Sequence, residues 1–124
     1  MSPLTRTLLR LQAVYYLATG LWPVASITTF EMVTGPKTDE WLVRMVGLLA
    51  AVIGLAVGVA AGARRLTPEL LVLSIGSALA FAAIDLFYAL AGVIAPVYLG
   101  DAVLQLGGVT LLAWSVRRTG VAAR

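Results

Sequence analysis

Residues 41–63 read WLVRMVGLLAAVIGLAVGVAAGA, and Arg44 is the only charged side chain in this run. An α-helix of about 20 mainly apolar residues crosses the roughly 30 Å hydrocarbon core of a lipid bilayer. Inside lipid, a helix satisfies its own backbone hydrogen bonds, so it is one of the few structures that can span a membrane. The run therefore predicts a transmembrane helix.

Three other runs have the same character, at residues 8–25, 69–94 and 98–116. Short polar segments separate them. Residues 67–69, Thr-Pro-Glu, place an N-cap residue, a proline and an acid in the order that helix starts favour. The sequence predicts an all-α protein: one integral membrane domain, residues 1–124, folded as a bundle of four transmembrane helices.

The composition agrees with a membrane protein and excludes several kinds of site. Charged residues make up 12% of the chain and hydrophobic residues 60%, whereas soluble domains carry about a quarter charged residues. The absence of cysteine and histidine removes disulfides, haem ligation through those residues and ordinary zinc sites. No serine or threonine has a base nearby, because the only lysine is Lys37 in a loop. We therefore expect no enzyme activity, no cofactor and no metal site.

The basic residues predict the orientation of the chain, because cytoplasmic loops are enriched in lysine and arginine. The two terminal segments and the loop after residue 63 hold most of them, and the other two loops with their flanks hold few. Both termini are therefore expected in the cytoplasm. Since these residues lie at helix ends and form no basic stripe, we expect no binding to nucleic acid. The first group is Arg6, Arg10, Arg64, Arg65, Arg117, Arg118 and Arg124, and the second is Lys37 and Arg44.

Gly54, Gly58 and Gly62 recur every four residues within the run at 41–63. This spacing places them on one face of a helix, where the missing side chains let another backbone approach closely in lipid. The favoured interpretation of this glycine zipper is packing inside the bundle. A seam between two copies of the chain is the alternative.

Asp85 is the only acidic residue deep inside a predicted span. A charge in hydrocarbon costs at least ~2.5 kcal/mol, so this side chain is expected to face the interior of the bundle. Counting the helical rise from the cytoplasmic ends brings Arg44 and Gln105 to a similar depth, with Trp22 above them. Tyr88, one turn beyond Asp85, is expected on the same side as a hydrogen-bond donor. We predict a polar cluster of these five residues.

An Arg44–Asp85 ion pair is the central element of that cluster. A structural role for the pair in fixing helix register is one interpretation. A ligand or ion site is the second, because carboxylates inside membranes mark such sites, and a contact with another membrane protein is the third. Glu40, four residues before Arg44 on the same helix, is the competing partner of Arg44.

The first run carries a polar stripe made of Gln12, Tyr15 or Tyr16, Thr19, and then Trp22 and Pro23. Helical spacing puts these residues on one face, where hydrogen bonds between helices explain them without a function. A groove for a lipid-like or aromatic molecule is the alternative. The stripe is polar for the core of a signal peptide, so a retained helix is favoured over a signal cleaved near residues 24–26.

The motifs GLWP at residues 20–23 and TGPKTD at residues 34–39 stand out within residues 15–47. This region resembles a pattern in small bacterial four-helix membrane proteins that are loosely similar to the DoxX-like group. The resemblance implies a four-helix bundle in the bacterial inner membrane and transfers no catalytic residue. DoxX itself is associated with a thiosulfate–quinone oxidoreductase complex, but nothing in this sequence indicates redox chemistry by the chain alone. Small multidrug transporters share the length and span number, yet their essential acid lies in the first span, which has none here.

Together these patterns predict a non-catalytic accessory or assembly protein of the inner membrane. Its expected partners are the lipid bilayer and either a second copy of the chain or another membrane protein. The alternative is a carrier or binder of a small amphipathic or cationic molecule, with Asp85 as the counter-charge. A subunit that acts only within an enzyme complex is a third interpretation.

Overall fold

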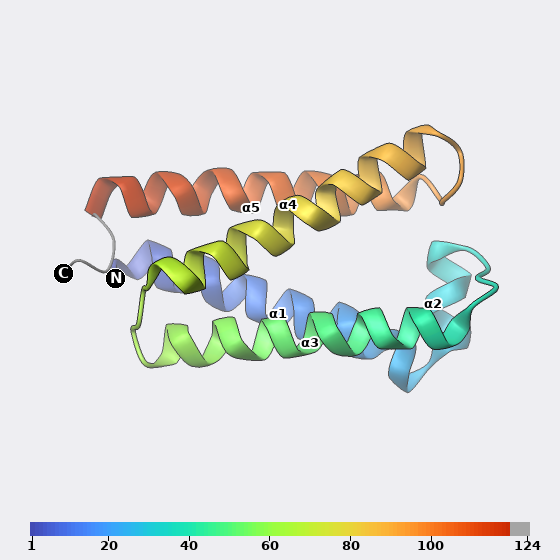
Figure 1. Cartoon of the computed structure of the whole chain (residues 1–124), viewed down its shortest axis with the longest axis horizontal. Helices are drawn as coiled ribbons and strands as arrows, with labels where there is room; N and C mark the ends of the chain where they lie inside the picture. The colour runs from blue at the N-terminus through green and yellow to red at the C-terminus, as the bar shows by residue number, and fades with distance from the viewer. Residues whose placement is uncertain (120–124) are drawn as a thin grey trace.

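The structure is a computed structural model that describes residues 1–119, and the regular structure in that part of the chain is entirely helical. Four long helices run along the bundle, and a short fifth one lies at one end (Figure 1). The prediction of an all-α fold is confirmed. The helices are α1 (Pro3–Ala25), α2 (Ile27–Thr34), α3 (Glu40–Gly62), α4 (Pro68–Leu90) and α5 (Val97–Thr119).

Three helices are long and apolar enough to cross a membrane, namely α3, α4 and α5 up to Arg118. This supports a membrane protein, but the prediction of four such helices is correct for only three. α1 has the same length as α3, 23 residues, yet polar side chains such as Arg10, Gln12 and Tyr15 make it less apolar. Gln12 and Tyr15 bond to other helices, so their polarity is used inside the bundle.

Capping residues decide where the helices begin. The Ser2 hydroxyl accepts a hydrogen bond from the Thr5 amide at 3.1 Å, so α1 begins earlier than the predicted start at residue 8. The Thr67 hydroxyl accepts from the Leu70 amide at 3.1 Å and starts α4 where the sequence predicts it. Each bond satisfies an amide that has no partner within its own helix.

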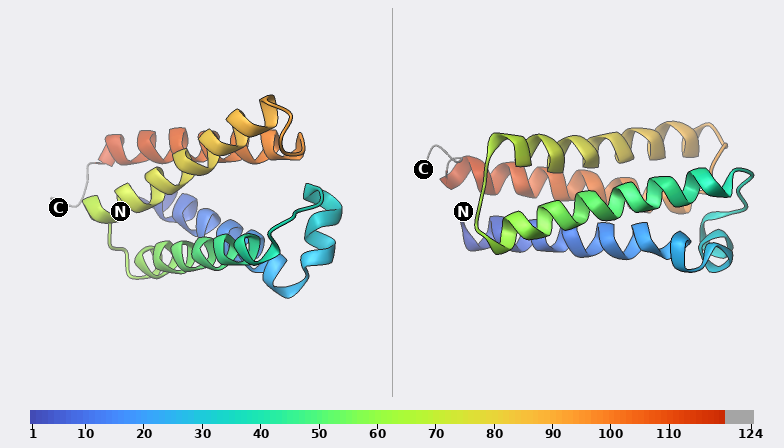
Figure 2. Two further views of the ribbon diagram at one scale, coloured as in Figure 1. Left: turned by 45° about the vertical axis from the view of Figure 1, so that its right-hand side comes forward. Right: turned by 60° about the horizontal axis from the view of Figure 1, so that its bottom comes forward.

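The four long helices form two antiparallel pairs. α1 packs against α3, and α4 packs against α5. α1 also contacts α5, whereas α3 and α4 have few contacts although they are neighbours in sequence. Figures 1 and 2 show the N-terminus, the α3–α4 connection and the last turns of α5 at one end of the bundle, and α2 and the α4–α5 connection at the other.

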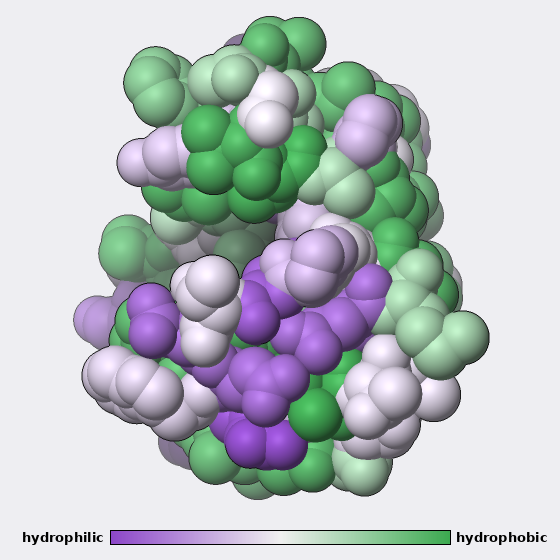
Figure 3. Space-filling model, turned by 90° about the vertical axis from the view of Figure 1, so that its right-hand side faces the viewer, coloured by the Kyte–Doolittle hydropathy of each residue, from purple (hydrophilic) through white to green (hydrophobic). Residues whose placement is uncertain are grey.

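α2 covers one end of the bundle. The Trp22 indole donates to the Thr29 hydroxyl at 3.0 Å, and its ring meets Phe30 edge-on with the centroids 5.3 Å apart. The Lys37 ammonium lies 5.4 Å from the centre of the Tyr98 ring of α5. These contacts connect the α2 segment to α1 and to α5. Hydrophilic surface gathers at this end of the molecule (Figure 3).

α1 and α3 approach each other backbone to backbone. A Cβ added to Gly47 would collide with the carbonyl oxygen of Gly20, and one added to Gly20 would lie 2.9 Å from the amide nitrogen of Ala51. Only a residue without a side chain fits at these two positions. Gly20 and Gly47 were not part of the predicted glycine motif.

The three glycines of the predicted motif differ in what they face. Two continue the α1–α3 contact that Gly20 and Gly47 make, which we call the α1–α3 seam, and the third faces open space. A Cβ on Gly54 would lie 2.9 Å from the carbonyl oxygen of Ala13, and one on Gly58 would lie 3.2 Å from the Cβ of the same alanine. A Cβ on Gly62 would meet nothing within 4 Å. Two of the three glycines therefore face α1 of the same chain.

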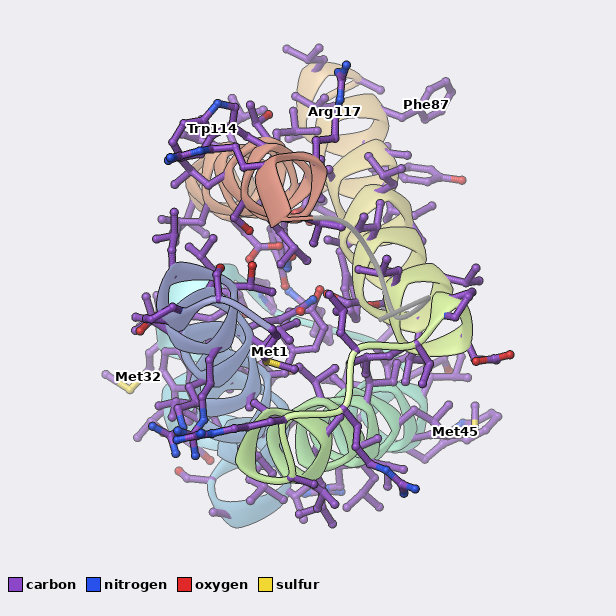
Figure 4. All side chains as sticks on the ribbon, turned by 90° about the vertical axis from the view of Figure 1, so that its left-hand side faces the viewer. Met1, Met32, Met45, Phe87, Trp114 and Arg117 are labelled. Atoms are coloured by element: carbon purple, nitrogen blue, oxygen red, sulfur yellow. The ribbon has the colours of Figure 1, made fainter. Side chains whose placement is uncertain are left out.

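Large apolar side chains lie on the outside of the bundle. Phe87, Met32, Met45 and Trp114 all point away from the helices in Figure 4, and Phe87 is 67% exposed. Lipid tails are as apolar as these side chains and cover them without penalty, whereas soluble monomers seldom expose large contiguous apolar patches. This distribution agrees with the membrane environment that the sequence predicts.

The α1–α3 seam predicts opposite outcomes for two glycines of one motif. Gly54→Ala should lower the free energy of unfolding by about 1–3 kcal/mol, because the new methyl group forces backbone atoms apart. Gly62→Ala should leave stability unchanged or slightly raised, since its Cβ enters open space and alanine favours a helix. Thermal unfolding of the purified chain in detergent measures both; equal effects would contradict the observed seam.

Candidate functional site

α4 presents a stripe of small and polar residues to the interior of the bundle. Its buried positions follow helical spacing from Ser74 through Ala78 and Ala82 to Asp85, which is 5% exposed. The ring of Phe81, on the same side, meets Tyr16 of α1 edge-on with the centroids 5.5 Å apart. α1 reaches α4 through long side chains such as Tyr16 and Gln12. Asp85 points to the interior, as the sequence predicts for a charge in hydrocarbon.

A second carboxylate, Asp101 of α5, forms the centre of a hydrogen-bond network. The Tyr15 hydroxyl donates to Asp101 Oδ1, and the Gln105 side-chain amide donates to the same oxygen at 3.4 Å. The Tyr16 hydroxyl donates to Gln105 Oε1 at 2.8 Å. Two adjacent tyrosines of α1 are thus held by two residues one turn apart on α5.

Asp85 lies beside Asp101, within hydrogen-bonding reach of its carboxyl group, and one of its own two carboxyl oxygens stays unpaired. Its Oδ2 atom is buried and has no hydrogen-bond partner among residues 1–119. The charged group that acts on it is the Asp101 carboxyl. No lysine or arginine in the described part of the chain forms a salt bridge with either acid. We refer to Asp85, Asp101, Tyr15, Tyr16 and Gln105 as the carboxylate cluster.

Further along the bundle, α1 makes polar contacts that are fully paired. The Gln12 amide donates to the Ser74 carbonyl oxygen at 3.0 Å, and the Ser74 hydroxyl donates back to Gln12 Oε1. The Thr5 and Ser115 hydroxyls lie 2.8 Å apart. Figure 4 shows nitrogen and oxygen atoms gathered between the helices. The polar stripe of α1 therefore binds α4 and α5. Its groups are hydrogen-bonded, whereas Asp85 Oδ2 is not.

The predicted Arg44–Asp85 ion pair is wrong. Arg44 is exposed on α3, and among residues 1–119 it forms no salt bridge with Asp85 or with the competing partner, Glu40. The reason is the helix pairing: α3 packs on α1, while Asp85 lies on α4, which has few contacts with α3. Equal depth in the membrane does not bring two residues together when their helices face different neighbours.

Of the other predicted site residues, one belongs to the carboxylate cluster and two lie outside it. Gln105 is 7% exposed and belongs to the carboxylate cluster through Asp101. Tyr88 is 38% exposed and packs against Phe87, with the ring centroids 5.0 Å apart, on the outside of α4. Trp22 bonds to α2 and does not roof the cluster.

Sequence reasoning missed Asp101 and left the choice between Tyr15 and Tyr16 open. Asp101 follows the helix-breaking residues Pro96 and Gly100 in the sequence, so its position predicts the edge of a span and not the interior. The signal that identifies it is its spacing of four residues from Gln105, which puts the acid and the amide on one face of α5. Both tyrosines are used, because they bond to consecutive turns of that face.

Comparison of the chain with known protein families, characterised proteins and solved structures finds no match. What the site can bind must therefore be inferred from the chemical groups of the site itself. Two carboxylates, two phenols and an amide offer oxygen atoms to a positively charged group. No group of three or more histidine, cysteine or acidic side chains able to hold a metal occurs in residues 1–119.

Two tyrosines test the composition of the cluster. Tyr16→Phe removes the hydroxyl that bonds to Gln105 and should lower the free energy of unfolding by about 0.5–2 kcal/mol, since a buried amide oxygen loses its donor. Tyr88→Phe removes a hydroxyl from the outside of α4 and should have no measurable effect. Unfolding in detergent compares the two; a loss for Tyr88→Phe alone would contradict the observed arrangement.

Proposed function

We propose that this chain is a small multi-pass membrane protein that binds a cation, or a small amphipathic molecule with a positive charge, between α1, α4 and α5. The observation that carries the proposal is the buried Oδ2 of Asp85, which has no hydrogen bond within residues 1–119 and lies beside Asp101. Buried charges are costly unless they are paired. Because the described chain supplies no cation, a bound one would complete the site.

The surroundings favour an organic cation over a bare metal ion. Tyr15 and Tyr16 line the cluster, and Phe81 packs against Tyr16. Aromatic faces attract ammonium-like groups, and carboxylates provide the counter-charge. Calcium takes six to eight oxygen ligands, and Asp101 Oδ1 already accepts hydrogen bonds from Tyr15 and Gln105. The ligand class we propose is therefore a monovalent, partly apolar cation.

We propose further that all four long helices span a bacterial inner membrane, with both termini in the cytoplasm. α1 runs along α3 for most of its length and bonds to α4 and α5 through its polar face, which supports a spanning role despite its lower hydropathy. Arginines gather at the end of the bundle that contains the N-terminus, as the positive-inside rule expects for a cytoplasmic end.

Binding of tetraphenylphosphonium, an aromatic monovalent cation, tests the proposed site. Isothermal titration on the detergent-solubilised chain should detect binding that Asp85→Asn and Asp101→Asn each weaken by about tenfold or more, the effect of losing a charged partner worth about 1.5–3 kcal/mol. Glu40→Gln, which removes an acid from the same end of the bundle outside the cluster, should bind like the unaltered chain. Triphenylphosphine oxide, a neutral aromatic relative, should not bind.

Thermal unfolding separates this function from a structural role for Asp85. If Asp85 binds a ligand, Asp85→Asn should keep or raise the stability of the ligand-free chain, because two neighbouring carboxyl groups no longer repel each other. A large loss of stability together with unchanged tetraphenylphosphonium binding would overturn the proposal.

An accessory role in assembly is the second candidate, and unused small-residue faces favour it. A Cβ on Gly76 of α4 or on Gly107 or Gly108 of α5 would meet nothing within 4 Å. Ala80 and Ala83 continue the exposed face of α4. Small residues let helices of two chains approach closely in lipid. The resemblance of the sequence to DoxX-like proteins, which include a component of a larger complex, agrees with this candidate.

Leucine substitutions test the assembly role. Gly107→Leu should reduce recovery of an oligomer or of a second polypeptide in native mass spectrometry, while the stability of the chain alone stays unchanged. Val103→Leu, at a site that is 70% exposed on the same helix, is the matched control and should leave assembly intact. A bare monomer in the unaltered protein would remove this candidate.

A further inference from the structure

The end of the bundle that contains the N-terminus carries a concentrated positive charge. Six arginines belong to the helix ends and the connection that meet there, and Glu69 at the start of α4 is the only acid among those segments in residues 1–119. The arginines are Arg6, Arg10, Arg64, Arg65, Arg117 and Arg118. We refer to this part of the molecule as the arginine end.

Within it, Arg6 is fixed in place by a hydrogen bond. Its Nε donates to the carbonyl oxygen of Ala61 at 2.9 Å, in the last turn of α3. One carbonyl that lacks a partner at the end of α3 is thereby satisfied. The bond uses Nε and holds the guanidinium beside the α3–α4 connection, where Arg64 lies.

Arg10 and Arg64 lie close enough to Arg6 to repel it. Desolvation, followed by repulsion from Arg10 and then Arg64, lowers the pKa of the Arg6 guanidinium from its ordinary value. Arg10 is one turn after Arg6 on α1 and is exposed. Three like charges thus act on one another, and no acidic side chain of residues 1–119 forms a salt bridge with them.

The backbone at Arg64 adds an independent observation. Its φ is 57°, in the left-handed region that side-chain-bearing residues rarely adopt, and it is the only non-glycine residue with positive φ among those described. Glycine is the usual residue at this position after a helix. Strained positions of this kind often coincide with functional sites.

We propose that Arg6, Arg10 and Arg64 form a binding site for the phosphate of an anionic phospholipid. Guanidinium groups bind phosphate oxygens in pairs of parallel hydrogen bonds. The site lies at the end of α1 and α3 (Figure 1), and exposed apolar side chains of the same two helices, such as Leu11 and Val59, are there for acyl chains to cover. A phospholipid satisfies both features at once: its phosphate neutralises the arginines and its chains contact the helices.

Thermal unfolding of the full chain in detergent, with phosphatidylglycerol or phosphatidylcholine added, tests this site. Phosphatidylglycerol should raise the Tm, and phosphatidylcholine should not. Arg10→Gln should weaken the lipid response by about fivefold in lipid concentration, the effect expected for one arginine near an anionic headgroup. Arg44→Gln, which removes an unpaired arginine from the opposite end of α3, should retain the full response.

Arg64→Gly separates binding from folding. Glycine relieves the left-handed backbone, so the Tm without lipid should stay the same or rise, while the response to phosphatidylglycerol falls as in Arg10→Gln. Neither variant breaks the bond between Arg6 and Ala61, so both should fold.

Several results would overturn the proposal: an equal response to phosphatidylcholine, a full response in both Arg10→Gln and Arg64→Gly, or an equal loss in Arg44→Gln. An equal rise in Tm with inorganic phosphate alone would identify free phosphate as the ligand and overturn the lipid assignment. The test is independent of the carboxylate cluster at the other end of the bundle, because Asp85→Asn should leave the response to phosphatidylglycerol unchanged.

Discussion

The backbone contact between α1 and α3 is the constraint on which the rest of the structure depends. At Gly20 and Gly47 the two helices leave no room for a side chain, and Gly54 continues the contact against Ala13. This seam holds α1 in the bundle although α1 is less apolar than a typical spanning helix. It also sets the rotation of α1, so that Tyr15 and Tyr16 point to α5. The carboxylate cluster exists because that rotation brings them to Asp101 and Gln105.

The polar groups inside the bundle are paired to different degrees along its length. Near the N-terminus, Thr5 and Gln12 pair fully with Ser115 and Ser74 and hold the helices together. Towards α2 the pairing is incomplete, because Asp85 keeps a buried oxygen without a hydrogen bond. In the low dielectric of the interior, hydrogen bonds between paired polar groups are stronger than in water. For the same reason, a buried polar group without a partner costs more free energy. A fold that satisfies most of its interior and leaves one carboxylate open has the form expected of a binding site.

Charge is separated between the two ends of the molecule. The carboxylate cluster lies towards the α4–α5 connection, and the arginine end lies at the opposite side, more than two turns of helix away. An Arg44–Asp85 pair would require α3 to pack against α4. Because α3 packs against α1 instead, Arg44 stays exposed and Asp85 stays without a cation.

The sequence by itself determined the helical class, the apolar character of residues 41–63, 69–94 and 98–116, and the inward aim of Asp85. These follow from hydropathy, helical period and the cost of a charge in lipid, which are local or one-dimensional properties. The tertiary structure alone decided which helices are neighbours, and with that which residue lies next to Asp85: Asp101 of α5 and not Arg44. Helix pairing depends on how the small residues of two surfaces fit together, as at Gly20 and Gly47, and no single segment contains that information.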